Sequence, residues 1–127
     1  AGKGTRMRSV LPKVLHQICG KSMLQLVAEA INRAGVGPTL VVVPIEATSI
    51  RSVLGTSVSY AVQNEPLGSG DALKQARSTL KDVDHIAVLH GDVPLIRSET
   101  LVAMKKIHED RNAAVTILTG ILYGRPV

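Results

Sequence analysis

The sequence predicts an α/β domain in which a mostly parallel sheet is flanked by helices. Short, β-branched apolar runs alternate along the chain with segments whose apolar residues keep helical spacing, and this alternation is typical of βαβ units. The runs are continuously apolar, as expected for strands covered on both faces. With 127 residues and 45% hydrophobic composition, the chain fits one domain with a sizeable core.

Four helices are expected from apolar spacing together with start and stop signals. Ser22 is suited to cap the first helix, and Gly35 supplies its C-terminal stop. Ser98 is expected to cap the last helix in the same way. On that helix, Lys105-Lys106 and Glu109-Asp110 are placed for ion pairs between residues four apart, which indicates a solvated face. The expected helices cover residues 23–34, 49–54, 71–80 and 98–110.

Four strands are expected between these helices, over residues 39–43, 57–62, 85–89 and 114–118. Ligands of parallel sheets bind at the carboxyl ends of the strands, where polar, glycine-containing loops follow residues 62 and 89. The opening loop, residues 1–7, should also follow a strand. We therefore expect a first strand before Ala1, which this sequence lacks.

The opening loop is suited to bind an anion. Gly2 and Gly4 permit a tight turn whose backbone N–H groups can form a concave anion site. A plain solvated loop is an equally good interpretation of this short element. The basic residues that precede the first acidic residue, Glu29, make the local charge positive; they are Lys3, Arg6, Arg8, Lys13 and Lys21.

Asp92 follows the third expected strand, between Gly91 and Pro94. A carboxylate at a strand end, near basic groups and a nucleotide, is a plausible Mg²⁺ ligand. The alternative is a turn-forming aspartate, which is common because Asp hydrogen-bonds its own backbone.

Gln63 follows the second expected strand and carries an amide that both donates and accepts, as reading a base edge requires. A loop-stabilising amide is at least as good an interpretation. Gly68-Ser69-Gly70 precedes a helix and could approach a ribose or base closely. Its alternative is a flexible turn in which Ser69 or Asp71 caps the helix.

Composition excludes several classes of protein. With no Trp or Phe and two Tyr, the chain lacks the aromatic platforms on which single-stranded nucleic acids stack, so nucleic acid is a poor first hypothesis despite a net charge of +5. Because Cys19 is the one cysteine, the chain cannot form an internal disulfide, which is consistent with a reducing compartment such as the cytoplasm. The Cys19 side chain is expected to be small, apolar and buried. No apolar run reaches the length of a membrane span.

The segments together resemble a known family. Ala1-Gly2-Lys3-Gly4-Thr5-Arg6-Met7, Leu11-Pro12-Lys13-Val14-Leu15-His16 and Gly20-Lys21-Ser22-Met23-Leu24 look like the signature of sugar-nucleotide pyrophosphorylases of the nucleotidyltransferase type. Gln63-Asn64-Glu65-Pro66-Leu67-Gly68-Ser69-Gly70-Asp71-Ala72 and Gly91-Asp92-Val93-Pro94-Leu95-Ile96 narrow the resemblance to the bacterial bifunctional UDP-N-acetylglucosamine pyrophosphorylase/glucosamine-1-phosphate acetyltransferases. The likeness extends from Ala1 to about residue 118.

The resemblance implies a Rossmann-like fold of the nucleotide-diphospho-sugar transferase type and a cytoplasmic uridylyltransferase for cell-wall precursor synthesis. Its substrates would be UTP and N-acetylglucosamine-1-phosphate, and the full-length family is expected to form homotrimers. Arg6 and Lys13 would be catalytic, countering phosphate charge, and Asp92 would bind the catalytic Mg²⁺. The implied substrate-binding residues are Ala1, Gly2 and Gly4 around the triphosphate, Gln63 and Gly68 on the uracil side, and Ser69.

The sequence also departs from the family. Ser69 stands where the family usually has Thr, and it retains the hydroxyl. The segment from Thr119 to Pro126 could match either the family's substrate loop, which contains Tyr-Gly-Arg, or a later Asn-Thr-Gly-Ile stretch. We favour the later stretch, so we expect residues to be missing near 118–119 and take Tyr123-Gly124-Arg125 as a coincidental likeness to the sugar-binding loop. The second metal ligand, the sugar contacts and the β-helix acetyltransferase domain would then be absent. Residues 1–127 would be a partial uridylyltransferase domain with little turnover. Two alternatives remain, another sugar-1-phosphate nucleotidyltransferase and a non-catalytic nucleotide-binding module.

Overall fold

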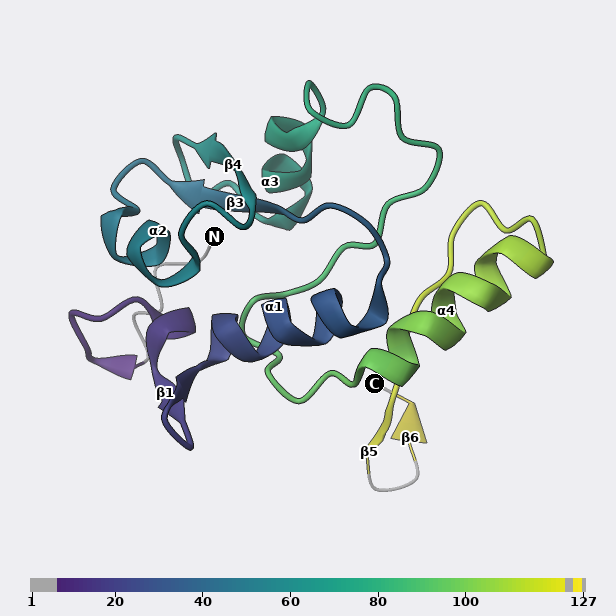
Figure 1. The fold of residues 1–127 in the computed structure, drawn as a ribbon, viewed down its shortest axis with the longest axis horizontal. Helices are drawn as coiled ribbons and strands as arrows, with labels where there is room; N and C mark the ends of the chain where they lie inside the picture. The colour runs from purple at the N-terminus through teal and green to yellow at the C-terminus, as the bar shows by residue number, and fades with distance from the viewer. Residues whose placement is uncertain (1–6, 123–124, 127) are drawn as a thin grey trace.

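The computed structural model describes residues 7–122 and 125–126 and has the α/β architecture expected from the sequence (Figure 1). It contains a pair of parallel strands with helices packed beside it. Ala1, Gly2, Gly4 and Arg6 of the opening loop lie outside the described residues. Tyr123 and Gly124 lie outside them as well.

The parallel pair consists of β3 (Leu40–Pro44) and β4 (Ser59–Gln63), in a register that runs from Leu40 opposite Ser59 to Pro44 opposite Gln63. The helix α2 (Thr48–Leu54) connects them, as a parallel connection requires a crossover. The helix α3 (Ser69–Ala76) packs against both strands. Because the strands are parallel, their carboxyl ends meet at one edge of the sheet.

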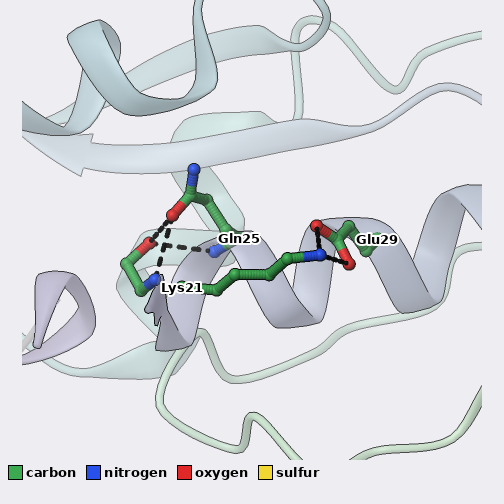
Figure 2. Close-up of polar contacts among 4 residues, drawn as sticks. Lys21, Gln25 and Glu29 are labelled. Carbon is green, nitrogen blue, oxygen red and sulfur yellow. Dashed lines mark hydrogen bonds and ion pairs between the residues drawn. The ribbon is translucent and has the colours of Figure 1, made fainter. Parts of the chain in front are cut away.

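The first long helix, α1 (Met23–Ala34), begins and ends where its sequence signals predict. The Ser22 hydroxyl accepts from the Gln25 backbone N–H at 3.2 Å, and the Ser22 backbone N–H donates to Gln25 Oε1 at 2.9 Å (Figure 2). This reciprocal capping box satisfies N–H groups that have no partner within the helix. Gly35 ends the helix in the left-handed conformation, with φ 60° and ψ 31°.

A short hairpin precedes α1 that the sequence did not lead us to expect. The strands β1 (Gln17–Ile18) and β2 (Lys21–Ser22) pair antiparallel. Their turn consists of Cys19 and Gly20, both with positive φ, 49° and 82°, the combination that a two-residue type I′ hairpin needs. Cys19 is exposed, so the expected burial of this thiol is wrong: a tight turn places it at the surface.

The last long helix, α4 (Ser98–Asp110), has the predicted bounds and packs against α1. Its cap differs from the prediction, because Arg97 is the N-cap residue and makes no side-chain capping bond. Ser98 is the first helical residue instead, and its hydroxyl contacts the Glu99 carboxylate at 3.3 Å. The predicted charge pairs are present, Lys105 with Glu109 at 3.9 Å and Lys106 with Asp110 at 2.6 Å.

Two predicted strands, residues 85–89 and 114–118, are wrong: both segments lack regular secondary structure. A strand requires a neighbour that hydrogen-bonds to its backbone, and neither segment pairs with any strand of the described chain. Most of their apolar side chains are exposed, Val88 to 60% and Ile117 to 76%. Farther on, β5 (Ile121–Leu122) and β6 (Arg125–Pro126) pair antiparallel.

The core is aliphatic, as expected for a chain with no Trp or Phe, and it lies between the parallel pair, α2 and the start of α1. Val43 is its most deeply buried large side chain, at 1% exposure. The other buried members of this cluster are Leu15, Leu24, Ala47, Ile50 and Leu54. Of the helices in the described part of the chain, none is long and apolar enough to cross a membrane.

Candidate functional site

The carboxyl end of β4 carries Gln63, whose side chain is directed at the start of α3. The residue is only 3% exposed. Its amide nitrogen donates to the Gly68 carbonyl at 3.1 Å and to the Asp71 carboxylate at 2.7 Å. Two residues predicted to contact substrate, Gln63 and Gly68, are therefore brought into direct contact.

Gly68 is the N-cap residue of α3, with φ 98° and ψ 178°. This backbone conformation is accessible essentially only to glycine, which explains why glycine stands where the strand-end loop turns into the helix. Ser69 is the first residue of α3. The helix thus begins two residues before the predicted Asp71, and neither of the predicted caps, Ser69 or Asp71, is its N-cap.

The second strand-end loop of the prediction brings Asp92 to Lys13. Lys13 lies in the 3₁₀ helix η2 (Lys13–Leu15), and its Nζ is 2.7 Å from Asp92 Oδ2. The segment between α3 and α4, which carries Asp92, runs past α1 (Figure 1). It packs closely there, because a Cβ added at Gly91 would lie 3.1 Å from Leu24 Cδ1 and 3.4 Å from Val14 Cγ1.

Asp92 is held in its charged form. The hydrogen bond from the Lys13 ammonium lowers the pKa of the Asp92 carboxyl below its ordinary value, and the charges of Lys13 and His90 act in the same direction against the cost of partial burial. The two side chains are 42% (Lys13) and 35% (Asp92) exposed, so both are accessible to a ligand. The pair presents a carboxylate and an ammonium side by side at the surface.

Asp92 is chemically suited to hold Mg²⁺ together with a nucleotide. Mg²⁺ is usually bound by one or two protein carboxylates plus substrate phosphates and water, and the carboxylate of Asp92 already stabilises a cation, the Lys13 ammonium. No group of three or more His, Cys, Asp or Glu suited to hold a metal occurs within residues 7–122 and 125–126.

Lys21, one of the basic residues that made the N-terminal charge positive in the sequence, is paired within the fold. Its Nζ lies 2.7 and 2.9 Å from the two Glu29 carboxylate oxygens (Figure 2). This hydrogen bond lowers the pKa of the Glu29 carboxyl. The ion pair balances the charge of Lys21, so the positive field of this region is weaker than the sequence predicted.

Asp71 was missed as a residue of the site, because its position near the start of a helix made it only a candidate cap. The signal that could have found it is the Gln63 amide eight positions earlier, at the end of a strand that leads into the same helix. Ala1, Gly2, Gly4 and Arg6 lie outside the described residues, so their roles remain predictions.

Comparison with known proteins supplies the family. The sequence model of the MobA-like NTP transferase domain matches residues 1–125. The chain belongs to this family. Membership agrees with the parallel strand pair and its flanking helices, and it makes the chain a Rossmann-like nucleotidyltransferase domain.

Curated relatives of this NTP transferase domain carry the name "Bifunctional protein GlmU". The protein from Brevibacillus brevis is 44% identical over the whole chain, which covers 29% of that relative. Those from Exiguobacterium sibiricum and Clostridioides difficile are 46% and 41% identical over 94% of the chain, covering 27% and 26% of the relatives. The chain thus spans little more than a quarter of the length of the curated relatives it matches.

Proposed function

We propose that this NTP transferase domain is a uridylyltransferase that forms UDP-N-acetylglucosamine and pyrophosphate from UTP and N-acetylglucosamine-1-phosphate, for cell-wall precursor synthesis. The observation that carries the proposal is the Lys13–Asp92 pair, which brings an ammonium group and an ionised carboxylate together at a partly exposed position. The sequence identity of 41–46% to relatives named GlmU supports this reaction over other reactions of NTP transferases.

In this reaction a phosphate oxygen of the sugar-1-phosphate attacks the α-phosphorus of UTP. A new oxygen–phosphorus bond forms, the bond from the α-phosphorus to the oxygen that bridges to the β-phosphate breaks, and pyrophosphate leaves with that electron pair. Such transfers need little covalent chemistry from the protein and depend on positioning and neutralisation of charge. Arg6 and Lys13 are the proposed catalytic cations.

Asp92 and the phosphates of UTP would hold Mg²⁺ between them, and the bound ion would supply positive charge to the phosphates. In the structure the Lys13 ammonium is the cation beside Asp92. We infer that Lys13 exchanges Asp92 for phosphate when UTP and Mg²⁺ bind. The exchange is feasible because both side chains are partly exposed and a surface ion pair is weak.

The remaining site residues divide between the two ends of UTP. Ala1, Gly2 and Gly4 would surround the triphosphate with backbone N–H groups. Gln63, Gly68 and Ser69, which lie together at the junction of β4 and α3, would contact the uracil end. We place the reaction in the cytoplasm, consistent with the single, unbridged Cys19, and we expect the longer family chain to be a homotrimer that does not bind nucleic acid.

Calorimetric titration of the chain with UTP in the presence of Mg²⁺ tests the nucleotide site. We expect Lys13→Ala to weaken binding roughly tenfold, as the loss of a charged hydrogen bond would. The matched control is Lys105→Ala, which changes an exposed lysine of α4 and should leave binding unchanged. No measurable UTP binding, or equal loss in both variants, contradicts the proposed site.

Turnover is tested by placing residues 1–118 in the Brevibacillus brevis relative in place of its matching segment, so that the relative supplies the remainder of the domain. The expected result is Mg²⁺-dependent pyrophosphate release from UTP and N-acetylglucosamine-1-phosphate, lost in Asp92→Ala. Preference for dTTP, CTP or GTP would indicate another sugar-1-phosphate nucleotidyltransferase. UTP binding without any pyrophosphate release would indicate a non-catalytic nucleotide-binding module.

A further inference from the structure

The orientation of the Gln63 carboxamide follows from the chemistry of its partners. The group within 3.1 Å on one side is the Gly68 carbonyl, and the group within 2.7 Å on the other is the Asp71 carboxylate. A carbonyl and a carboxylate only accept hydrogen bonds. The amide nitrogen must therefore face α3, and the amide oxygen is turned away from it.

Asp71 is the stronger of the two partners. A hydrogen bond to a charged carboxylate is shorter and stronger than one to a neutral carbonyl, in keeping with the shorter of the two distances. The carboxylate itself is held from a second side, since Gln75 Nε2 lies 3.4 Å from Asp71 Oδ1 one turn along α3. Gln63 is 3% exposed, so little water is available to replace Asp71.

We propose that Asp71 is a positioning residue for base selection, which holds the Gln63 carboxamide with its oxygen, rather than its nitrogen, toward the nucleobase. This inference rests on the proposed function, in which Gln63 contacts the base. An amide oxygen can accept two hydrogen bonds. The Gln63 oxygen can therefore accept one hydrogen bond from a donor of the protein and a second one from a ligand.

The consequence is a preference for bases whose ring nitrogen carries a hydrogen. Uracil presents an N3–H donor, which pairs with the Gln63 oxygen. Cytosine has nearly the same size and shape but presents an N3 lone pair, which the oxygen repels. If the amide were free to rotate by half a turn, its nitrogen would serve cytosine equally well. Asp71 removes that choice, because the rotated amide would place its oxygen against the carboxylate.

Titration of Asp71→Ala and Asp71→Asn with UTP and with CTP tests the proposal. The wild-type chain should prefer UTP, and in both variants the ratio of the two dissociation constants should move toward one by roughly tenfold, the worth of about one hydrogen bond. The matched control is Asp82→Asn, an exposed aspartate beyond α3, which should keep the wild-type ratio. A merely structural role at the start of α3 would weaken both nucleotides equally and leave the ratio unchanged, which overturns the proposal.

A ligand-free measurement separates this proposal from the proposed function. In NMR spectra the two side-chain N–H protons of Gln63 should exchange slowly with water in the wild type and in Asp82→Asn, and at least tenfold faster in Asp71→Ala. Unchanged exchange in Asp71→Ala shows that Asp71 does not hold the amide. If the exchange rates are as expected but the wild type does not bind UTP, the proposed nucleotide site is refuted. Asp71 would then hold the Gln63 amide without any role in base selection.

Discussion

The Lys13 ammonium and the Asp92 carboxylate lie 2.7 Å apart although 79 positions separate them in the chain. The contact joins the short helix η2, before the β1–β2 hairpin, to the loop that leads into α4. Each residue is proposed to bind a different part of the same substrate complex. In the ion pair, the Lys13 ammonium and the Asp92 carboxylate, the groups proposed to bind phosphate and Mg²⁺, bind each other.

Asp92→Asn should strengthen UTP binding when Mg²⁺ is absent and abolish the effect of Mg²⁺. Without the carboxylate, Lys13 has no competing partner, and the affinity for UTP should rise severalfold, consistent with a surface ion pair worth under about 1 kcal/mol. Calorimetric titrations with and without Mg²⁺ measure both effects. Lys106→Ala, which breaks a comparable surface pair on α4, should change neither. A metal effect that persists in Asp92→Asn would exclude Asp92 as the ligand.

The same pair makes a small contribution to stability that depends on pH. Because the hydrogen bond from Lys13 lowers the pKa of Asp92 from its ordinary 3.8, the contribution is fully present above that value. It is lost as the pH falls through the lowered pKa of the folded state. Because the side chains of Lys13 and Asp92 are 42% and 35% exposed, the contribution of the pair to the free energy of unfolding should not exceed about 1 kcal/mol.

Urea unfolding of the wild type and Asp92→Asn between about pH 7 and pH 3 measures this contribution as a difference in the free energy of unfolding. The difference should be constant near neutrality and shrink in acid. In a Lys13→Met background the same comparison should show little dependence on pH. A difference that grows in acid would contradict the assignment.

Ser22→Ala should lower the free energy of unfolding by about 1 kcal/mol, because it removes one half of the capping box at the start of α1. Ser22 is only 3% exposed, so water does not easily replace the lost bond. Thermal or urea unfolding gives the value. Ser49→Ala, at an exposed position of α2, is the control and should stay within about 0.5 kcal/mol of the wild type; equal effects would argue against the cap.

Gly91→Ala and Gly70→Ala should change stability in opposite directions. A Cβ at Gly91 meets Leu24 Cδ1 at 3.1 Å, so Leu24 must shift and about 1 kcal/mol should be lost. A Cβ at Gly70, in the first turn of α3, meets nothing within 4 Å and should add roughly 0.5 kcal/mol by restricting the unfolded chain. Urea unfolding compares the two, and a stabilising Gly91→Ala would mean that the loop before Asp92 is not closely packed on α1.

Local signals in the sequence predicted the parts of the fold that depend on neighbouring residues. Ser22 and Gly35 bound α1 as expected, and the β-branched valines of β3 lie in the parallel strand pair. Residues 85–89 have equally suitable composition and form no strand, because strand formation depends on a partner that composition does not specify. The Cys19-Gly20 turn was missed because the type I′ signal is usually Asn-Gly or Asp-Gly.

The candidate site was predictable in part. Placing Gln63 at a strand end follows from the α/β pattern, and its contact with Gly68 at the start of α3 agrees with it. Asp92 was placed at a strand end as well, and that part of the prediction is wrong because residues 85–89 form no strand. The contacts of Asp71 and Lys13 were not predictable, since they depend on side-chain directions across the junction of β4 with α3 and between segments far apart in the chain. Lys21 shows the same limit, because its pairing with Glu29 depends on the hairpin that folds back onto α1.

The large separation between Lys13 and Asp92 has a consequence for the kinetics of folding. Closing a loop of 79 positions costs chain entropy that a weak surface pair cannot offset alone, so the pair should form only after β3, β4 and α1 have assembled. A contact that forms after the folding transition state does not change the folding rate, but a protein that has the contact unfolds more slowly than one that lacks it. The two residues proposed to grip UTP and Mg²⁺ would thus meet late in folding, once the framework that positions them is in place.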